Sequence, residues 1–347
     1  MTARGSQAGS QAPARAEATT KRTQVTTTRG LTQVALTALR RLRGQDGGAP
    51  DIDISAREAS DHVFCFAGEF GYELISWLPY LHDLKRNLDF RLVTCGRPGS
   101  KVFYNFSDEH HEFGVGVVGD MWGDLPTYAS LRASLGGKPF IFPRIKRNIR
   151  VGGRSWTMRD IHREIPDDYW APLDYSAVRL PTPFRFERPF IVVNNKFVGE
   201  WGRPPINYFN REELIAVRDF LVARGYAVVY NHFREKTRTD PILGVELDDS
   251  GIFGTVEHTY DLSDEYRRTN DIGERNRAQI SVYNQAAFVV TPQGGPTYLP
   301  AICRRNLVML MRKGDYIDFR ELSRVYGVDV DVFYEVPHML AWLGTRL

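Results

Sequence analysis

Short apolar runs alternate with longer segments of helical periodicity along most of this chain. The runs have the length of buried strands, which we expect at 62–67, 90–95, 115–118, 138–142, 189–193, 226–230, 287–290 and 307–310. Apolar residues at helical spacing predict helices over 74–84, 211–224 and 275–285. Strands separated by helices are typical of βαβ units, which build mainly parallel sheets. The pattern therefore predicts an α/β protein.

The order of these elements divides the 347 residues into four parts. We expect a tail over 1–58, an N-terminal α/β domain over 59–150, a connecting region over 151–186 and a C-terminal α/β domain over 187–347. A chain of this length exceeds what one hydrophobic core usually supports, which agrees with two domains. Ligands of open parallel sheets bind at the carboxyl ends of the strands, so the loops after the strands are the places to search.

The tail differs from the rest of the chain in composition and charge. Residues 1–50 hold eight Lys/Arg and two Asp/Glu, of 45 and 42 in the whole chain. Residues 1–30 are rich in Ser, Thr, Gln, Ala and Gly, and we expect them to be disordered. The remaining charge is close to balanced, so the sequence does not indicate nucleic acid as a partner.

Residues 31–43 form a basic amphipathic segment within this tail. Apolar residues fall on one helical stripe, and Arg40, Arg41 and Arg43 cluster at its end. Such a helix suits an anionic membrane surface; the alternatives are docking on a protein surface and a targeting peptide. No apolar run approaches the ~20 residues of a membrane span. We therefore expect a cytoplasmic protein that contacts the inner membrane face peripherally.

The most informative motif is the segment FVVTPQGGPTYLPAIC over residues 288–303. A strand runs into a glycine pair, and a helix is expected to begin near Thr297. Free N–H groups and the positive end of a helix dipole would then face an anion. Gly294 and Gly295 allow a phosphate or a sugar to approach the backbone, and Thr297 is either a cap or a ligand contact. The segment predicts a site for a phosphorylated donor; an ordinary tight turn is the alternative.

This arrangement resembles the GT-B class of glycosyltransferases, in which two Rossmann-like domains face each other across a cleft. Within that class, VVTPQGGPTY over residues 289–298 is similar to the C-terminal donor loop of family-61 and fucosyltransferase-like enzymes. Gln293 stands where family-61 enzymes often carry His, and Pro296 interrupts the run. The resemblance covers roughly residues 187–312. It implies two Rossmann-like domains and a nucleotide-sugar substrate, with no cofactor and no metal.

Polar and basic residues follow the other strands of the C-terminal half. Successive strand ends should bring these side chains to the crevice of the glycine loop, where basic groups neutralise a leaving diphosphate. For each basic residue alone, a solvated loop charge is the alternative. His232, beside them, suits a donor contact. The predicted donor-binding residues are Lys196, Arg203, Asn231, Arg234, Gln293, Gly294, Gly295 and Thr297.

The N-terminal half contains its own strand–glycine–helix segment, AGEFGYEL over residues 67–74. In GT-B enzymes the comparable loop commonly borders the acceptor and sometimes supplies the base. We therefore expect Glu69 and Glu73 at the mouth of the cleft as the first candidates for a general base, with Asp108 behind them. First-turn helix charge is the alternative for Glu73.

Metal-binding and disulfide patterns are weak. The tripeptides at 51–53 and 329–331 match the Asp-x-Asp of metal-using transferases, but one lies in the linker and the other in a terminal strand. We assign no metal to them. The adjacent His110 and His111 are expected in a solvated loop. Cys65, Cys95 and Cys303 are few and far apart, which suits a reducing compartment.

The leading hypothesis is a glycosyltransferase that moves a sugar from a nucleotide-sugar donor to a glycan or lipid-linked acceptor in surface polysaccharide or glycolipid assembly. A nucleotide-sugar epimerase would share the glycine loop and the basic strand ends, but would consume donor without an acceptor. A non-catalytic scaffold would bind sugar or phosphate without turnover.

Overall fold

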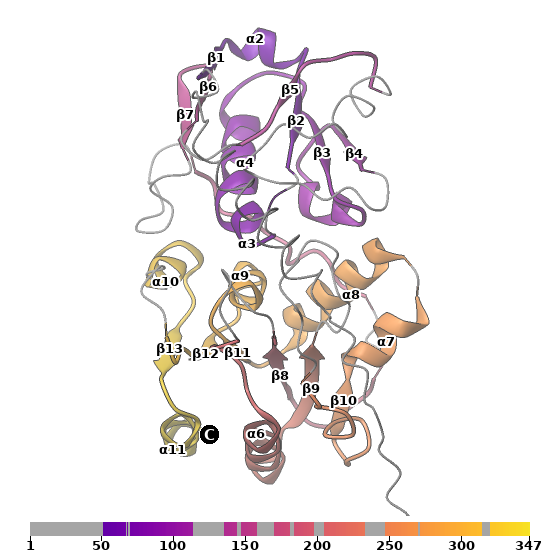
Figure 1. The fold of residues 1–347 in the computed structure, drawn as a ribbon, viewed down its shortest axis with the longest axis vertical. Coiled ribbons are helices and arrows are strands. Elements are labelled where there is room, and N and C mark those ends of the chain that lie inside the picture. Colours follow the sequence, from indigo (N-terminus) through magenta and orange to yellow (C-terminus); the bar gives the residue numbers. More distant parts are fainter. Residues whose placement is uncertain are drawn as a thin grey trace, which may run out of the picture. The chain divides into compact units, whose positions relative to one another are not determined.

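Two parallel sheets, one in each half of the chain, organise this protein (Figure 1). The computed structural model describes residues 51–66, 68, 70–113, 135–143, 147–157, 170–180, 184–197, 205–232, 247–269, 271–313 and 320–347. Residues 48–347 form one compact unit that contains both sheets. The predicted α/β class with parallel sheets is confirmed. The amphipathic segment 31–43 and the strand expected at 115–118 lie outside the described residues.

The larger sheet occupies the C-terminal half and has six parallel strands in the order β10-β9-β8-β11-β12-β13. These strands are β8 (Phe190–Asn195), β9 (Ala227–His232), β10 (Thr259–Asp261), β11 (Val289–Pro292), β12 (Leu307–Leu310) and β13 (Val330–Phe333). Counted along the chain, their order is 3-2-1-4-5-6, which is that of the doubly wound dinucleotide-binding sheet. The direction of winding therefore reverses between β8 and β11.

Helices cover both faces of this sheet, because alternate residues of each strand point to opposite sides. Val193 packs with Leu214 of α6 and Met339 of α11, whereas Val192 belongs to the cluster that contains Ile280 of α8 and Ile302 of α9. Burial on both faces explains why the strands are continuous apolar runs in the sequence. The helices of this half are α6 (Arg211–Ala223), α7 (Leu262–Arg268), α8 (Ile272–Gln285), α9 (Gly295–Ile302), α10 (Arg320–Tyr326) and α11 (Val336–Arg346).

Helix α6 shows how closely local sequence sets an element. Asn210 caps its first turn and forms a capping box with Glu213, since each side chain binds the backbone N–H of the other residue. Beyond the last turn, Gly225 adopts φ 85°, a conformation that ends the helix. The helix predicted over 211–224 is confirmed.

The smaller parallel sheet has the order β4-β3-β2-β5 and lies in the N-terminal half. Its strands are β2 (Val63–Cys65), β3 (Val93–Gly96), β4 (Glu109–Glu112) and β5 (Phe140–Ile141). Counted along the chain, their order is 3-2-1-4, so the winding again reverses beside the first strand. A helix follows β2 as α3 (Phe70–Tyr72), a π-helical turn (Glu73–Trp77) and α4 (Leu78–Asn87). Ser100–Tyr104 forms a 3₁₀-helix after β3.

A third, three-stranded sheet contradicts two boundaries predicted from the sequence. It joins β1 (Ile52–Ile54) to the hairpin of β6 (Asn148–Val151) and β7 (Arg154–Thr157), and α2 (Ala56–Ala59) follows β1. Hence the predicted tail 1–58 includes a strand and part of a helix, and the predicted connection 151–186 includes β7. These three strands are short and mix polar with apolar residues, so no apolar run marks them; only pairing between segments far apart in the sequence reveals them.

The prediction that His110 and His111 lie in a solvated loop is wrong, because both belong to β4. Neighbouring strand residues face opposite sides of a sheet. The His110 ring stacks on Tyr104 at 4.3 Å, while His111 Nε2 lies 2.8 Å from Glu109 Oε1. Burial lowers the pKa of His110 to about 3, so this imidazole is neutral.

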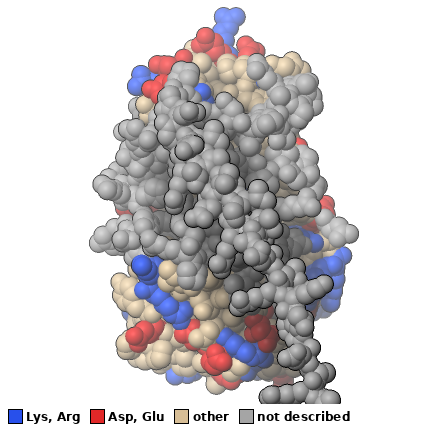
Figure 2. Space-filling view, in the orientation of Figure 1, with Lys and Arg blue, Asp and Glu red and all other residues tan. Residues whose placement is uncertain are grey.

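The described residues show mixed surface charge and no membrane-spanning helix, as the composition predicts. On the face drawn in Figure 2, basic and acidic side chains of the described residues are intermixed. None of the described helices is both long and apolar enough to cross a membrane.

The β6–β7 hairpin is attached to α4 by a largely buried ion pair. Arg154 Nη2 donates to Asp83 Oδ1 at 2.9 Å, and its Nε donates to the other carboxylate oxygen. The side chains are 26% and 6% exposed. Removing one partner leaves the other charge buried, so we expect Arg154→Ala to lower the free energy of unfolding by about 3 kcal/mol. Urea denaturation measures this change.

The matched control is Arg150→Ala in the same hairpin. Arg150 pairs with Asp53 at 3.6 Å, and both side chains are more than half exposed. Its loss should cost less than about 1 kcal/mol. Equal losses in the two variants would contradict the assignment of the Arg154 pair as the attachment.

Candidate functional site

The strand ends at the reversal point of the larger sheet are tied together by buried amides. Asn194, at the end of β8, donates from Nδ2 to the carbonyl of Pro296 at 3.1 Å, in the first turn of α9. Asn231, at the end of β9, donates to Asn194 Oδ1 at 3.0 Å. The convergence predicted for the ends of 189–193, 226–230 and 287–290 is therefore seen at β8, β9 and β11.

The glycine turn after β11 leaves a helix N-terminus without a side-chain cap. Gly294 is the N-cap residue, with φ 120° and ψ −153°, a region that essentially only glycine occupies. A Cβ built on Gly295 would meet no atom of the described residues within 4 Å. Pro296 has no N–H and the Thr297 N–H donates to the Gly294 carbonyl at 2.9 Å, so the N–H of Gly295 is the candidate donor of the first turn, at a helix end whose dipole suits an anion.

The side chains on either side of this turn serve the fold. Thr297 is fully buried, and its hydroxyl donates to the carbonyl of Pro292 at 3.2 Å. It does not cap α9, contrary to one of the two roles predicted for it. Gln293 Oε1 accepts from Asn207 Nδ2 at 2.7 Å, which connects the turn to a loop after β8. Both residues fix the shape of the glycine turn from within.

Asn231 also acts inside the protein, in a network beneath the turn. Its amide donates to Asn194 and to the Tyr283 hydroxyl at 2.9 Å, and its carbonyl oxygen accepts from the Tyr266 hydroxyl at 3.0 Å. Asn231 is 4% exposed. The sequence identified the residue and its position, but the structure uses its hydrogen bonds to support Asn194.

On the opposite face of the sheet, the end of β9 carries a second polar group. His232 Nδ1 lies 2.5 Å from Asp249 Oδ2, and the Tyr230 hydroxyl donates to the same oxygen at 2.5 Å. All three side chains are buried. Sequence reasoning missed Asp249, because it follows His232 by 17 positions and no motif indicates that the two residues meet.

Several predicted site residues lie at the edges of what the structure describes. Lys196 directly follows β8, at the reversal point. Glu69, Arg203 and Arg234 lie outside the described residues. The roles assigned to these four residues stay predictions.

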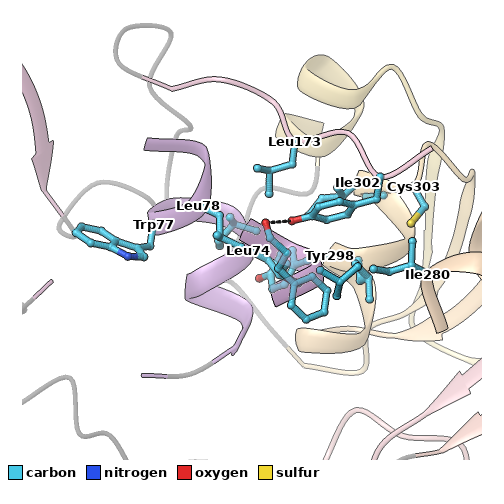
Figure 3. Packing of buried hydrophobic residues seen from close by; sticks show 14 of the residues in the cluster. Leu74, Trp77, Leu78, Leu173, Ile280, Tyr298, Ile302 and Cys303 are labelled. Atoms are coloured by element: carbon cyan, nitrogen blue, oxygen red, sulfur yellow. Dashed lines mark hydrogen bonds between the residues drawn. The ribbon is translucent and has the colours of Figure 1, made fainter. Parts of the chain in front are cut away.

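The carboxyl ends of the two parallel sheets meet at a contact between α3 and α9. A Cβ on Gly71 would lie 3.1 Å from the Tyr298 ring and 3.9 Å from the Cα of Gly295. Figure 3 shows the same junction, with Leu74 and Leu78 of the N-terminal half beside Tyr298 and Ile302 of α9. The loop after β2 and the glycine turn after β11 are therefore neighbours.

Glu73 lies beneath this junction. Its position in the motif had predicted a place at the mouth of a cleft instead. Its side chain is fully buried; Oε1 accepts from the Tyr104 hydroxyl at 2.6 Å, and Oε2 lies 3.0 Å from Arg97 Nη2. Burial raises the pKa of Glu73, while the Arg97 charge and the hydrogen bonds oppose the shift. Glu73 opens the π-helical turn, a local widening often found at functional sites.

The structure separates Asp108 from Glu73. Its carboxylate accepts from Lys85 Nζ at 2.7 Å and from the backbone N–H of Leu92 at 2.7 Å. The hydrogen bond from Lys85 lowers its pKa. Asp108 precedes β4 and Leu92 precedes β3. Both therefore lie at the amino ends of the strands, opposite to the carboxyl ends that carry the site. This placement contradicts a catalytic role for Asp108.

The described residues offer no group of three His, Cys, Asp or Glu side chains arranged to hold a metal ion. The two Asp-x-Asp tripeptides lie apart, in β1 and beside β13. Asp51 accepts from the Asn148 side chain at 3.1 Å, and Asp53 pairs with Arg150.

Comparisons with known proteins give similarities only at the level of solved structures. No protein-family model and no curated protein sequence matches the chain. The structure of Escherichia coli ADP-heptose lipopolysaccharide heptosyltransferase II is similar, with 12% identity, 82% of this chain and 97% of that chain covered, and a TM-score of 0.49. E. coli heptosyltransferase WaaC, in a complex with ADP-2-deoxy-2-fluoro heptose, shares 11% identity over 82% of this chain and 99% of that one, with a TM-score of 0.47. A family 9 glycosyl transferase from Veillonella parvula shares 9% identity over 85% and 90%, with a TM-score of 0.48.

Proposed function

We propose that the protein is a glycosyltransferase that binds a nucleotide-sugar donor at the Gly294–Gly295 turn and transfers the sugar to a hydroxyl acceptor. One observation carries the proposal: α9 begins without a side-chain cap at the reversal point of a 3-2-1-4-5-6 parallel sheet, and a Cβ at its first residue, Gly295, would meet no atom of the described residues. The reversal point is where doubly wound sheets bind nucleotides, and the Gly295 N–H and the helix dipole suit a phosphate.

The contact between the two halves supports transfer over simple binding. Sugar transfer requires a stabilised leaving group, a base for the acceptor hydroxyl and alignment of the two substrates. The donor turn supplies the first, and the segment after β2 lies against it through Gly71 and Tyr298. We assign the base to that segment, with Glu69 as the residue to test, because the carboxyl of Glu73 is enclosed.

The remaining parts of the proposal concern the surroundings of the reaction. The acceptor is a glycan or a lipid-linked sugar, and residues 31–43 hold the enzyme at the inner membrane face. The reaction uses no metal, since the helix terminus and the basic residues neutralise the diphosphate. We also propose that the glycine loop corresponds to the donor loop of family-61 enzymes.

A thermal-shift panel of nucleoside diphosphates and nucleotide sugars, without metal, tests the donor site. A ligand that binds only the folded state raises the apparent Tm by mass action. At a ligand concentration of 100 times Kd, the free energy of unfolding increases by about 2.7 kcal/mol. We expect one nucleoside diphosphate to raise Tm, and its nucleotide sugar to be consumed only when acceptor is added. Consumption without acceptor would indicate an epimerase, and binding without turnover a scaffold.

The paired variants Gly295→Ala and Gly294→Ala test the glycine turn. The methyl group at position 295 meets no atom of the part of the chain that the structure describes, but occupies the space proposed for the phosphate. We expect unchanged or slightly higher stability, by up to about 1 kcal/mol, and nucleotide binding weakened by about tenfold or more.

Gly294→Ala is the structural counterpart of this change. At φ 120° the new side chain is strained, which should cost about 1–3 kcal/mol of folding free energy. Calorimetric titration with the nucleotide from the panel and thermal unfolding measure both effects. Unchanged nucleotide affinity in Gly295→Ala would rule out a phosphate at this turn.

The basic residues after β8 and β9 give a separate prediction. Lys196→Ala, Arg203→Ala and Arg234→Ala should each weaken donor binding by roughly 1.5–3 kcal/mol, because each removes a charge-assisted contact to phosphate. Arg346→Ala, at the last turn of α11, is the control and should bind normally. Wild-type affinity in all three variants would mean that the proposed crevice is wrong.

A further inference from the structure

Arg97 connects the end of β3 to three points of the segment that follows β2. Its Nη2 donates to the carbonyl of Gly68 at 2.7 Å and lies 3.0 Å from Glu73 Oε2. Its guanidinium carbon lies 5.2 Å from the centre of the Phe70 ring. One side chain thus contacts the beginning, the middle and the end of the six positions from Gly68 to Glu73.

The segment that Arg97 contacts is the one that abuts the donor turn. Gly71 lies within it and packs against Tyr298 and Gly295. A displacement of this segment therefore changes the spacing between the loop after β2 and the N-terminus of α9. Any group on the segment that acts on an acceptor must keep this spacing.

Tyr104 holds the Glu73 carboxylate from the other side. Its hydroxyl donates to Oε1 at 2.6 Å, and its ring stacks on His110. His110 is in turn held by the hydroxyl groups of Thr94 and Ser100, at 2.8 and 2.9 Å. Cys65 is also close to Tyr104, but burial raises its thiol pKa and so favours the neutral thiol; the charge that faces Glu73 is that of Arg97.

Stability alone is a weak reason for a charged Glu73 in this place. The Glu73 side chain is fully buried and the Arg97 side chain is 33% exposed, so the hydration that the carboxylate loses offsets much of its attraction to the guanidinium. Arg97 Nε is buried and has no hydrogen-bond partner among the described residues. The value of the pair is therefore geometric: a carboxylate between Tyr104 and Arg97 fixes the direction of the guanidinium.

We propose that Arg97, Glu73 and Tyr104 form a positioning network that holds the segment Gly68–Glu73 at its working distance from the donor turn. Arg97 is the positioning residue, and Glu73 and Tyr104 orient it. The inference rests on the proposed function, because the segment matters as the carrier of the base candidate Glu69. The network thereby gives Glu73 a structural role in catalysis that its enclosed carboxyl can perform.

The first test is Glu73→Gln, which keeps the shape of the side chain and removes its charge. Because burial raises the pKa of Glu73, the protonated form favours folding; that contribution is lost as pH rises above the usual 4.5 and through the raised value. Above the raised pKa the wild type bears the cost of the charge and the variant does not. We expect an equal or higher Tm, unchanged nucleotide affinity and kcat lowered about 100-fold through misplacement.

The second test is the series Arg97→Gln, Arg97→Lys and Tyr104→Phe, with Arg91→Gln as matched control. Arg91 precedes β3 and pairs with Glu109, at the amino ends of the strands of the same sheet. Hydrogen exchange of the amides at 68–73 should increase in Arg97→Gln and stay unchanged in the control. Arg97→Lys should recover part of kcat, with nucleotide affinity and KM for the donor unchanged throughout.

Two results would overturn the proposal: wild-type kcat with unchanged exchange at 68–73 in Arg97→Gln, or parallel losses of Tm, nucleotide affinity and kcat in Glu73→Gln. The second pattern would indicate an ordinary folding role. Hydrogen exchange and Tm report on the network even if wild-type protein binds no nucleotide. A failure of the proposed function is therefore distinguishable from a failure of the network.

Discussion

The rest of the structure depends on one constraint, the parallel pairing of strands that are connected through helices. Because all strands of each sheet run in the same direction, every loop that follows a strand emerges at the carboxyl end of that sheet. Both parallel sheets reverse their winding beside their first strand, at β2–β5 and at β8–β11. At the reversal of the larger sheet, α6 and α9 cover opposite faces, which separates the loops that follow β8 and β11. The glycine turn and the segment after β2 both lie at the carboxyl end of their sheet.

The glycine turn keeps its shape because buried amides hold it to the sheet. Asn194 binds the Pro296 carbonyl, and Asn231 with Tyr283 satisfies the remaining groups of Asn194. Such a network costs little when every member has partners, and it fixes a single arrangement because any displacement leaves a buried polar group unpaired. The start of α9 is thus held in one arrangement, and a preorganised dipole is what the proposed stabilisation of a leaving diphosphate requires.

Two of the contacts between the halves are made at glycines. Gly71 lies against Tyr298, and Gly99, where a Cβ would come within 2.7 Å of the Gly273 backbone, lies against the start of α8. Asn276 donates to the Gly99 carbonyl at 2.9 Å at this second contact. Close backbone approach sets the distance between the edges of the sheets with little side-chain freedom. The Arg97 network acts on the first of these contacts and leaves the second untouched.

The sequence by itself determined the elements whose cause is local. Strand β12 and helix α6 lie where apolar periodicity and the Asn210 cap placed them, and the glycine pair marked the turn before α9. What only the tertiary structure decided depends on pairing between distant segments. The short strands β1, β6 and β7, the burial of Glu73 by Tyr104 and Arg97, the meeting of His232 with Asp249 and the position of Asp108 on the far edge are of this kind. Periodicity and capping reflect interactions of a residue with its neighbours in the sequence. Burial and ion pairing between distant segments arise only after the sheets have formed.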